Sequence, residues 1–346
     1  MSEMLIHSNS QLSSDSLPDL CDTEQQPTDV AENGSLPPLD CYWNPGPETK
    51  RERLKLKLLH GVSQAGGLLR RVFGSLAKSS VGILTYHRIA PKYAGVPFPT
   101  INVTPDRFRR QIVGLQRQGF RFVALGSVLS AQRAGATLRD KTVVLTFDDI
   151  YDNVFQNAFP ILQELKIPAT VFISTAFIDS KEPFLFDPWA IENQQQLPTE
   201  AWLPITDEHL RAMLASGLIE LGAHTHTHRD FRNRPVEFAA DLERGVYELS
   251  SRYDAKRMSF AFPYGSPRMG FCDGDMMGAV ASLGLRCGLT TGPHTNPTAT
   301  SPFGWGRFHV FQHDTPNSLA AKLEGWYEWL PKLKNKLSRQ SVREAS

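Results

Sequence analysis

The feature that most constrains this chain is the uncharged run Thr142–Phe147, which ends in two adjacent carboxylates, Asp148 and Asp149. A β-branched and apolar run of this kind is typical of a strand buried on both faces of a parallel sheet. Adjacent residues at a strand end point in different directions, so each carboxylate can act differently on one substrate. From these residues alone, an alternative stays open in which Asp148 caps the next helix and Asp149 is its solvated neighbour.

Strand-like and helix-like segments alternate regularly from about residue 80 onwards. Strands are expected at 81–86, 121–125, 142–147, 169–174, 218–223, 258–262, 286–290 and 306–311. Helices are expected at 105–119, before 134, and at 153–165, 207–216, 235–253, from 275, and at 319–330, with an aromatic-rich insertion at 184–204. This alternation predicts an α/β fold with a parallel sheet, and the strand count favours a barrel over an open sheet.

Composition limits the compartment and the partners of the chain. The net charge of +1 gives no global attraction to nucleic acid, so no nucleic-acid partner is expected. The four cysteines form no CxxC pair and are interpreted as free thiols, which suits a reducing compartment. No run approaches the length of about 20 apolar residues that a membrane span needs, and the first residues lack the pattern of a secretory signal. A cytoplasmic location is therefore expected.

Four regions are predicted from shifts in charge and composition. Residues 1–48 contain acidic residues but no Lys or Arg, and they are predicted to form a disordered acidic tail. Residues 49–79 form a basic amphipathic lead-in. Its residues 51–78 contact the inner face of a membrane peripherally, pack on the domain as a helical lead-in, or pair electrostatically with the acidic tail. Residues 80–316 form the barrel, and 317–346 form a C-terminal helix with a basic tail.

Three histidines, His224, His226 and His228, directly follow the predicted strand 218–223. Imidazole nitrogens are the commonest protein ligands for zinc-like metals, and a mixed His/carboxylate set with an open position is typical of a catalytic site. The carboxyl ends of the strands carry the active site in (β/α) barrels, so these histidines and the carboxylate pair are expected on one face. Surface histidines at a strand end are the alternative interpretation.

The motifs Thr146-Phe147-Asp148-Asp149, His224-Thr-His-Thr-His228 and Phe260-Ala-Phe-Pro-Tyr-Gly265 occur in this order. Together they resemble the NodB-type polysaccharide deacetylases, carbohydrate esterase family four, and in particular a branch active on N-acetylated exopolysaccharides. The resemblance covers about residues 81–313. It implies a distorted (β/α) barrel with about seven strands.

Carried over residue by residue, the resemblance implies a divalent metal, zinc first and cobalt, nickel or manganese as alternatives. Its ligands would be Asp149, His224 and His228, with His226 outside the set. Asp148 would be the general base, and the backbone N–H of Tyr264 would be an oxyanion donor.

The chain departs from the family pattern in three respects. Ile150 stands where the family has Gly, so the pocket or the turn is expected to change. Ala261 stands where many members have an Arg that orients the base, and Arg307 is predicted to replace that Arg from the last strand. The late motif that supplies the usual acid is not recognisable. The resemblance to branches of the family that use the histidine of the early strand implies His87 as the general acid, with His309 as the alternative.

Aromatic side chains offer flat faces on which sugars stack. Tyr151, Trp189 and Trp305 are predicted to bind substrate, and Trp202 is a further candidate. The sequence thus predicts a hydrolase that removes acetyl groups, chiefly N-acetyl groups, from an amino sugar in an oligo- or polysaccharide or its precursor. The alternatives are a catalytically degenerate carbohydrate-binding protein on the same fold, and a deacetylase acting on O-acetyl groups or on another small amide.

Overall fold

The computed structural model describes residues 41–42, 77 and 79–326 of the chain. The chain divides into two units, Met1–Leu36 and Pro37–Ser346, and the described residues belong to the second unit. The predicted acidic tail and basic lead-in, with its membrane contact, therefore fall almost entirely outside the described residues. The same holds for the basic tail beyond residue 326.

The described part of the chain is built on a mostly parallel 10-stranded sheet. Seven of its strands follow one another in the order β1 (Ser80–Tyr86), β5 (Thr142–Phe147), β6 (Ala169–Ile173), β7 (Ile219–Ala223), β8 (Ser259–Ala261), β9 (Gly288–Leu289) and β11 (Phe303–Trp305). After Gly306 and Arg307 the chain enters β12 (Phe308–His309), which pairs with β1, so the sheet nearly closes. The predicted α/β barrel is confirmed.

Two short strands extend this sheet. The strand β4 (Arg121–Phe122) pairs with the beginning of β5. The sequence did not predict β10 (Asn296–Pro297), which pairs antiparallel with β1, or β11. Both are shorter than the four residues over which periodicity becomes readable. A separate pair, β2 (Arg88–Ile89) and β3 (Asn102–Val103), follows β1.

Strand register brings the predicted motifs to one edge of the sheet. Tyr86 at the end of β1 lies opposite Phe147 at the end of β5, and the Asp148 N–H donates to the Tyr86 carbonyl at 3.0 Å. Ala223 at the end of β7 lies opposite Ile173 of β6. The segments that follow these strands therefore leave the barrel on the same side, as expected for parallel strands.

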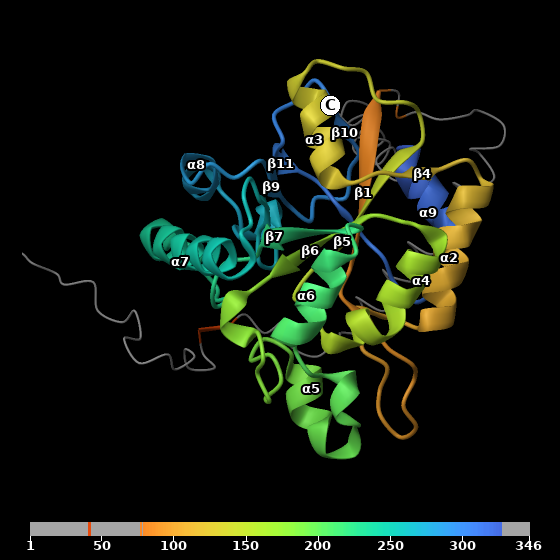
Figure 1. Cartoon of the computed structure of the whole chain (residues 1–346), viewed down its shortest axis with the longest axis vertical. Helices are drawn as coiled ribbons and strands as arrows, with labels where there is room; N and C mark the ends of the chain where they lie inside the picture. Colours follow the sequence, from red (N-terminus) through yellow and green to blue (C-terminus); the bar gives the residue numbers. More distant parts are fainter. Residues whose placement is uncertain (1–40, 43–76, 78, 327–346) are drawn as a thin grey trace, which may run out of the picture. The chain divides into compact units, whose positions relative to one another are not determined.

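Helices flank the sheet on its outside (Figure 1). They are α2 (Pro105–Arg117), α3 (Leu125–Arg133), α4 (Phe159–Leu165), α6 (Asp207–Ala215), α7 (Pro235–Tyr253), α8 (Gly274–Ser282) and α9 (Pro316–Leu323). The predicted helix 153–165 instead begins with a π-helical turn, η2 (Val154–Ala158). Pro160 explains this difference, because proline cannot donate the backbone hydrogen bond that would continue a regular helix.

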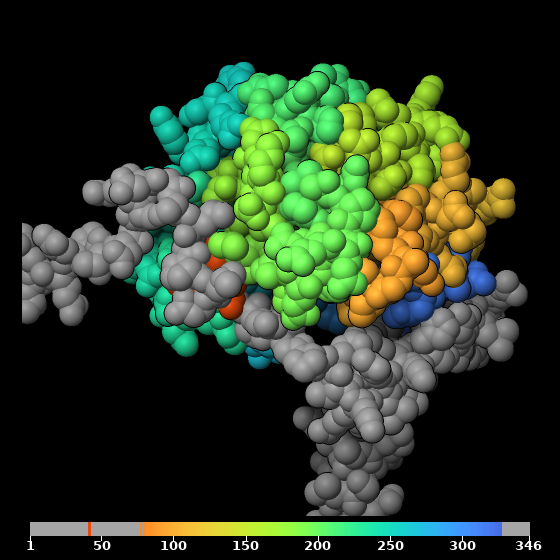
Figure 2. All heavy atoms as spheres, turned by 90° about the horizontal axis from the view of Figure 1, so that it is seen from below, coloured from red at the N-terminus to blue at the C-terminus, as the bar shows by residue number. Residues whose placement is uncertain are grey.

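The insertion predicted at 184–204 contains the short helix α5 (Pro188–Asn193) and the 3₁₀ turns η4 (Gln194–Gln196) and η5 (Thr199–Ala201). A third such turn, η3 (Thr175–Phe177), precedes the insertion, and η6 (Pro267–Met269) follows β8. Asp187 caps α5 by accepting a hydrogen bond from the Ala190 N–H at 3.2 Å. Figure 2 shows the green insertion side by side with the orange segment that follows β1, and the Trp189 indole N–H donates to the Pro97 carbonyl at 2.6 Å.

Helix α9 packs against the barrel, and the domain boundary after residue 316 stays a prediction. Leu319, Ala320 and Leu323 are part of the main hydrophobic core. A Cβ added at Gly82 in β1 would lie 2.3 Å from the Leu323 side chain. The helix therefore packs directly against the backbone of β1 at a position that has no side chain. The sequence signal was the apolar face of the helix, which periodicity showed but could not assign to a partner.

The described cysteines, Cys41, Cys272 and Cys287, are free thiols, as predicted. Burial raises the pKa of the Cys287 thiol to about 11. Within the described residues, no helix has both the length and the apolar character needed to cross a membrane.

Candidate metal centre and active site

Asp149, His224 and His228 form a compact buried cluster. Their potential ligand atoms all lie within 4.8 Å of one another. Asp149 Oδ1 lies 3.2 Å from His228 Nε2 and 3.5 Å from His224 Nε2, and it makes no hydrogen bond within the described part of the chain. A buried carboxylate oxygen without a hydrogen bond is costly unless a cation satisfies it. This donor set therefore fits a divalent metal with nitrogen and oxygen ligands.

Left-handed backbone conformations follow the strands that carry the cluster. Asp149 and Ile150 have φ of 66° and 55°, and Thr225 and His228 have φ of 63° and 57°. Non-glycine residues adopt this region rarely, and such residues gather at functional sites.

The two imidazoles of the cluster are held differently. His224 Nδ1 lies 2.6 Å from the Ala261 carbonyl, which accepts its proton and leaves Nε2 with a lone pair facing Asp149. His228 Nδ1 has no hydrogen-bond partner among the residues that the structure describes. His226 points elsewhere, with Nδ1 2.7 Å from Thr175 Oγ1 and 3.6 Å from Glu248.

Electrostatics favour the protonation states that a metal ligand needs. Burial alone would raise the pKa of Asp149, but the adjacent imidazoles of His224 and His228 hold that pKa well below its usual range. Burial lowers the pKa of His228, although Asp149 opposes this effect. An ionised carboxylate and a neutral imidazole are the forms that bind a metal.

Asp148 is held by a bidentate ion pair with Arg307. The two guanidinium nitrogens Nη1 and Nη2 lie 2.6 and 2.7 Å from the two carboxylate oxygens, and both side chains are buried. Burial alone would raise the pKa of Asp148, but Arg307, His224 and His87 together lower it. Arg307, which the sequence placed on the last strand, lies between β11 and β12 and also donates to the Thr290 carbonyl.

His87 and His309, the two candidates for the general acid, stack on each other. Their ring centroids are 5.4 Å apart, with an angle of 20° between the planes. Burial, His87 and Arg307 lower the pKa of His309 to about 3. Burial also lowers the pKa of His87, but there Asp149 and Asp148 oppose it. The local charges therefore favour a protonated His87 over a protonated His309.

Tyr264 lies in the Pro-Tyr-Gly turn beside the cluster. Its φ is 58°, its ring centroid is 4.7 Å from that of His228, and its hydroxyl donates to the His228 carbonyl at 3.3 Å. The motif thus contributes to the wall of the candidate metal centre. The role of the Tyr264 amide as an oxyanion donor stays a prediction.

Ile150 adopts a left-handed backbone conformation, and its side chain packs in the core rather than in the site. Its side chain is fully buried in the main core, and its N–H contacts the Asp148 carbonyl at 2.7 Å. A β-branched residue in the left-handed region is strained, so packing of the side chain must compensate. The sequence alone did not show whether the pocket or the turn would change where Ile150 replaces the family's Gly.

We expect Ile150→Gly to be more stable than Ile150→Ala, by about 1 kcal/mol, because Gly removes the left-handed strain that Ala retains. Both variants should be less stable than the wild type, since each loses a buried side chain worth about 2–5 kcal/mol. Urea denaturation measures the order. At Ile83, a buried residue of regular β1, the Ala variant should instead be the more stable one. An Ala variant at least as stable as the Gly variant at position 150 would contradict the strain argument.

The predicted sugar-stacking residues are mostly interior. Tyr151 is fully buried and its hydroxyl donates to Asp187 at 3.0 Å. Trp305 is 2% exposed within a hydrophobic cluster that includes Val81 and Leu289. Neither presents an open face to a sugar, because packing in the core occupies both. Trp202 is 8% exposed, and only Trp189 is more open.

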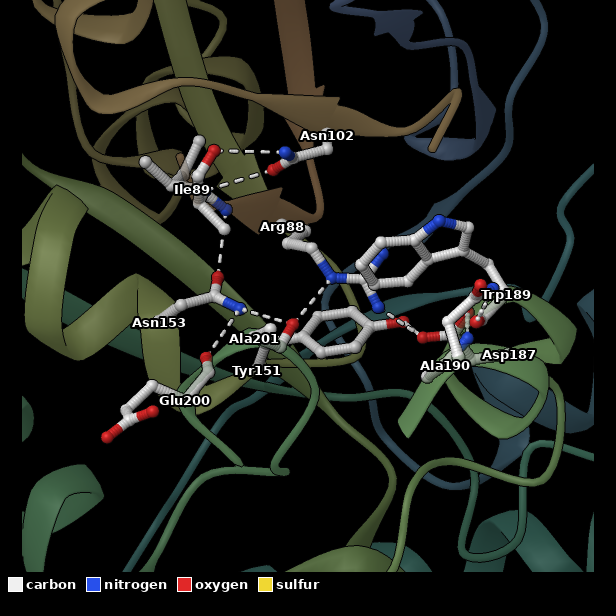
Figure 3. A network of polar contacts seen from close by, with 12 residues as sticks. Arg88, Ile89, Asn102, Tyr151, Asn153, Asp187, Trp189, Ala190, Glu200 and Ala201 are labelled. Atoms are coloured by element: carbon white, nitrogen blue, oxygen red, sulfur yellow. Dashed lines mark hydrogen bonds and ion pairs between the residues drawn. The ribbon is translucent and has the colours of Figure 1, made fainter. Parts of the chain in front are cut away.

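Arg88 and Asp187 form a buried ion pair that sequence reasoning did not assign to the site (Figure 3). The guanidinium lies over the rings of Tyr151 and Trp189, 4.2 and 4.6 Å from their centroids. Its Nε donates to the Ala201 carbonyl at 3.0 Å. The sequence signal for Arg88 was its place directly after His87, at the end of an apolar strand. Its partner Asp187 lies 99 residues away, so the sequence did not indicate the pair.

The sheet forms a nearly closed parallel barrel, and two carboxylates and two histidines follow the carboxyl ends of its strands. This is the arrangement of a barrel protein whose site is equipped for hydrolysis. The family model for polysaccharide deacetylases matches residues 135–288, which include all three motifs. This match covers less than half of the chain, and it confirms the resemblance to polysaccharide deacetylases that the motifs indicated.

Curated relatives and solved structures agree with this resemblance. A poly-beta-1,6-N-acetyl-D-glucosamine N-deacetylase of Staphylococcus aureus is 26% identical over 198 residues, which are 55% of this chain and 61% of that protein. The Staphylococcus epidermidis protein of the same name is 25% identical over 232 residues, 62% of this chain and 73% of that protein. The chain thus spans about three fifths of the length of the first relative.

Among solved structures, IcaB from Ammonifex degensii has a TM-score of 0.58 and 25% identity, covering 70% of this chain and 97% of that one. The Streptococcus pyogenes deacetylase PplD, solved with acetate, has a TM-score of 0.57 and 20% identity over 71% of this chain and 99% of that one. At that identity the second likeness concerns the fold.

Proposed function

We propose that this protein is a metal-dependent N-deacetylase that hydrolyses acetamide groups of an N-acetylglucosamine polymer, with β-1,6-linked chains as the first substrate to test. The observation that carries the proposal is the Asp149–His224–His228 cluster beside Asp148, which Arg307 holds. The names of the staphylococcal relatives suggest the polymer. As an alternative to the enzyme, a glycan-binding protein would bind the polymer and release no acetate.

Each residue has a defined task in this proposal. A divalent metal, with zinc the first choice, would be held by Asp149, His224 and His228 and would supply Lewis acidity and a water of lowered pKa. Asp148 accepts the proton of the attacking water, because Arg307 keeps its carboxylate ionised and oriented. As the C–N bond breaks, His87 donates a proton to the amine nitrogen, and the products are acetate and a free amino sugar.

Two further parts support the same reaction. The backbone N–H of Tyr264 is proposed to donate to the developing oxyanion, which is typically worth about 3 kcal/mol of barrier. Trp189, whose one face Arg88 covers, is the remaining candidate for stacking on a sugar. A cytoplasmic location, and action on a nucleotide- or lipid-linked precursor there, stay predictions.

Removing the metal should abolish acetate release, and adding about one equivalent of zinc should restore it. The measurement is enzymatic detection of acetate from a β-1,6-linked N-acetylglucosamine oligosaccharide, with an O-acetylated sugar alongside. Asp149→Ala and His228→Ala should each weaken zinc binding, because each removes one of three ligands. Acetate release that survives complete chelation would overturn the metal-dependent mechanism. Release from the O-acetylated sugar alone would reassign the substrate.

A further inference from the structure

We infer that Arg88 is a positioning residue for the candidate metal centre: its ion pair with Asp187 holds the Phe186 ring against the imidazole of His228. This inference rests on the proposed metal-dependent function and explains how one of its ligands is oriented. It concerns residues to which neither the motifs nor the relatives assign a role.

The first step is the unequal support of the two histidines. A metal-binding imidazole almost always donates its second N–H to an oxygen, which fixes the orientation of the ring. His224 follows this rule through the Ala261 carbonyl. His228 Nδ1 is buried and has no hydrogen-bond partner within the described residues, so another contact must hold its ring.

Aromatic rings provide that contact. The Phe186 ring stacks on His228 with 3.7 Å between centroids and 23° between planes. Tyr264 meets the imidazole edge-on, at 4.7 Å and 74°. The imidazole is thereby confined by one parallel and one roughly perpendicular ring, which restricts its rotation without a hydrogen bond.

The position of Phe186 depends in turn on Asp187, the next residue in the chain. The Asp187 carboxylate accepts hydrogen bonds from Arg88, from the Tyr151 hydroxyl at 3.0 Å and from the Ala190 N–H at 3.2 Å. Arg88 enters from β2, Tyr151 from the segment after β5 and Ala190 from α5 (Figure 3). Three elements thus converge on one carboxylate and fix the backbone that carries Phe186.

Arg88 is buried at considerable cost, which indicates a specific task. Its side chain is fully buried, and its Nη1 has no partner among the described residues. A buried cation of this kind is tolerated only with a close counter-ion, and replacing such a pair by apolar groups is often neutral or stabilising. Stability alone therefore does not explain why the pair lies beside the site.

The test measures zinc affinity by competition with a chromogenic chelator, and the visible spectrum of the cobalt-substituted protein. Phe186→Leu removes the flat ring, and Asp187→Asn keeps the helix cap but removes the charge. Each should weaken zinc binding by about tenfold, as other supporting residues of metal ligands do, and should change the cobalt spectrum. The double variant should bind zinc about as weakly as Phe186→Leu alone, because both changes act through one ring.

Matched controls separate positioning from general stability. Phe238→Leu removes a buried ring elsewhere in the barrel, and Asp314→Asn breaks another buried ion pair, with Lys322 at 2.8 Å. Both should lower Tm and leave zinc affinity within about twofold of the wild type. Arg88→Met combined with Asp187→Asn removes both charges. It should recover stability relative to Asp187→Asn alone but not zinc affinity.

The inference is overturned if Phe186→Leu binds zinc as tightly as the wild type, or if zinc affinity recovers together with stability in the charge-free double variant. Asp187→Asn is not needed for this decision if it fails to fold, because Phe186→Leu is tested independently. A wild-type protein that binds zinc but releases no acetate would remove the proposed function and leave the orientation of His228 intact. Normal acetate release by the wild type, together with unchanged zinc binding in every variant, would overturn the inference about His228 and leave the proposed function intact.

Discussion

Replacing Asp148 with Asn should reduce acetate release by at least about a hundredfold, because the amide cannot accept the proton of the attacking water. Zinc binding should stay close to that of the wild type, since the candidate ligands are Asp149, His224 and His228. Acetate assays and metal titration of the same preparation measure both properties. Loss of turnover with retained zinc binding would show that Asp148 acts as a base and not as a metal ligand.

A matched control for this variant lies four residues further along the chain. Asp152→Asn changes an equally small side chain whose carboxylate contacts His209 Nδ1 at 2.5 Å, outside the metal cluster. It should retain acetate release. If Asp148→Asn retains full turnover, another group is the base; if the wild type itself binds the glycan without releasing acetate, the glycan-binding alternative is correct.

The sequence predicted the parts of the site that local pattern determines. An uncharged β-branched run identified β5, and the residues after it had to reach the same edge as those after β1 and β7 once the sheet was parallel. The resemblance then separated Asp149, His224 and His228 from His226, and the structure brings those three together. These features are readable because strand ends and motifs are close in sequence.

Contacts between distant segments were much harder to predict. The partner of Arg88 lies 99 residues away and that of Asp148 lies 159 residues away, so spacing carries no signal for either pair. Arg307 could be suggested only because the family's usual Arg was replaced by Ala261. The stacking of Phe186 on His228 depends on how the insertion folds back, which no periodicity shows.

The sequence could not show that most of the predicted sugar-binding aromatics are buried. Large aromatic side chains bury extensive apolar area and are more often part of a core than of a binding surface. Trp305 follows that tendency, whereas Tyr151 uses its hydroxyl in the Arg88–Asp187 network. The left-handed backbone at Ile150 was likewise hidden, since a β-branched residue is a poor predictor of such a turn.

Replacing Arg307 with Met should have the largest effect on stability, lowering the free energy of unfolding by about 3–5 kcal/mol. Arg307 is fully buried and provides two hydrogen bonds to Asp148, whose own side chain is 4% exposed. Without the guanidinium, Asp148 would be a buried charge with no counter-ion of comparable geometry. Urea denaturation at neutral pH measures the loss, and Arg109→Met, which breaks an exposed pair with Glu164, should hardly change stability.

The double variant Arg307→Met with Asp148→Asn tests whether the loss of stability comes from the unpaired Asp148 carboxylate. Neutralising Asp148 removes the uncompensated charge, so the double variant should be more stable than Arg307→Met alone. Recovery should be partial, because Arg307 also donates to the Thr290 carbonyl and to the Thr85 hydroxyl. Losses that simply add in the double variant would show that Arg307 stabilises the barrel through those other contacts. In that case its pairing with Asp148 would serve the orientation of the base rather than the stability of the fold.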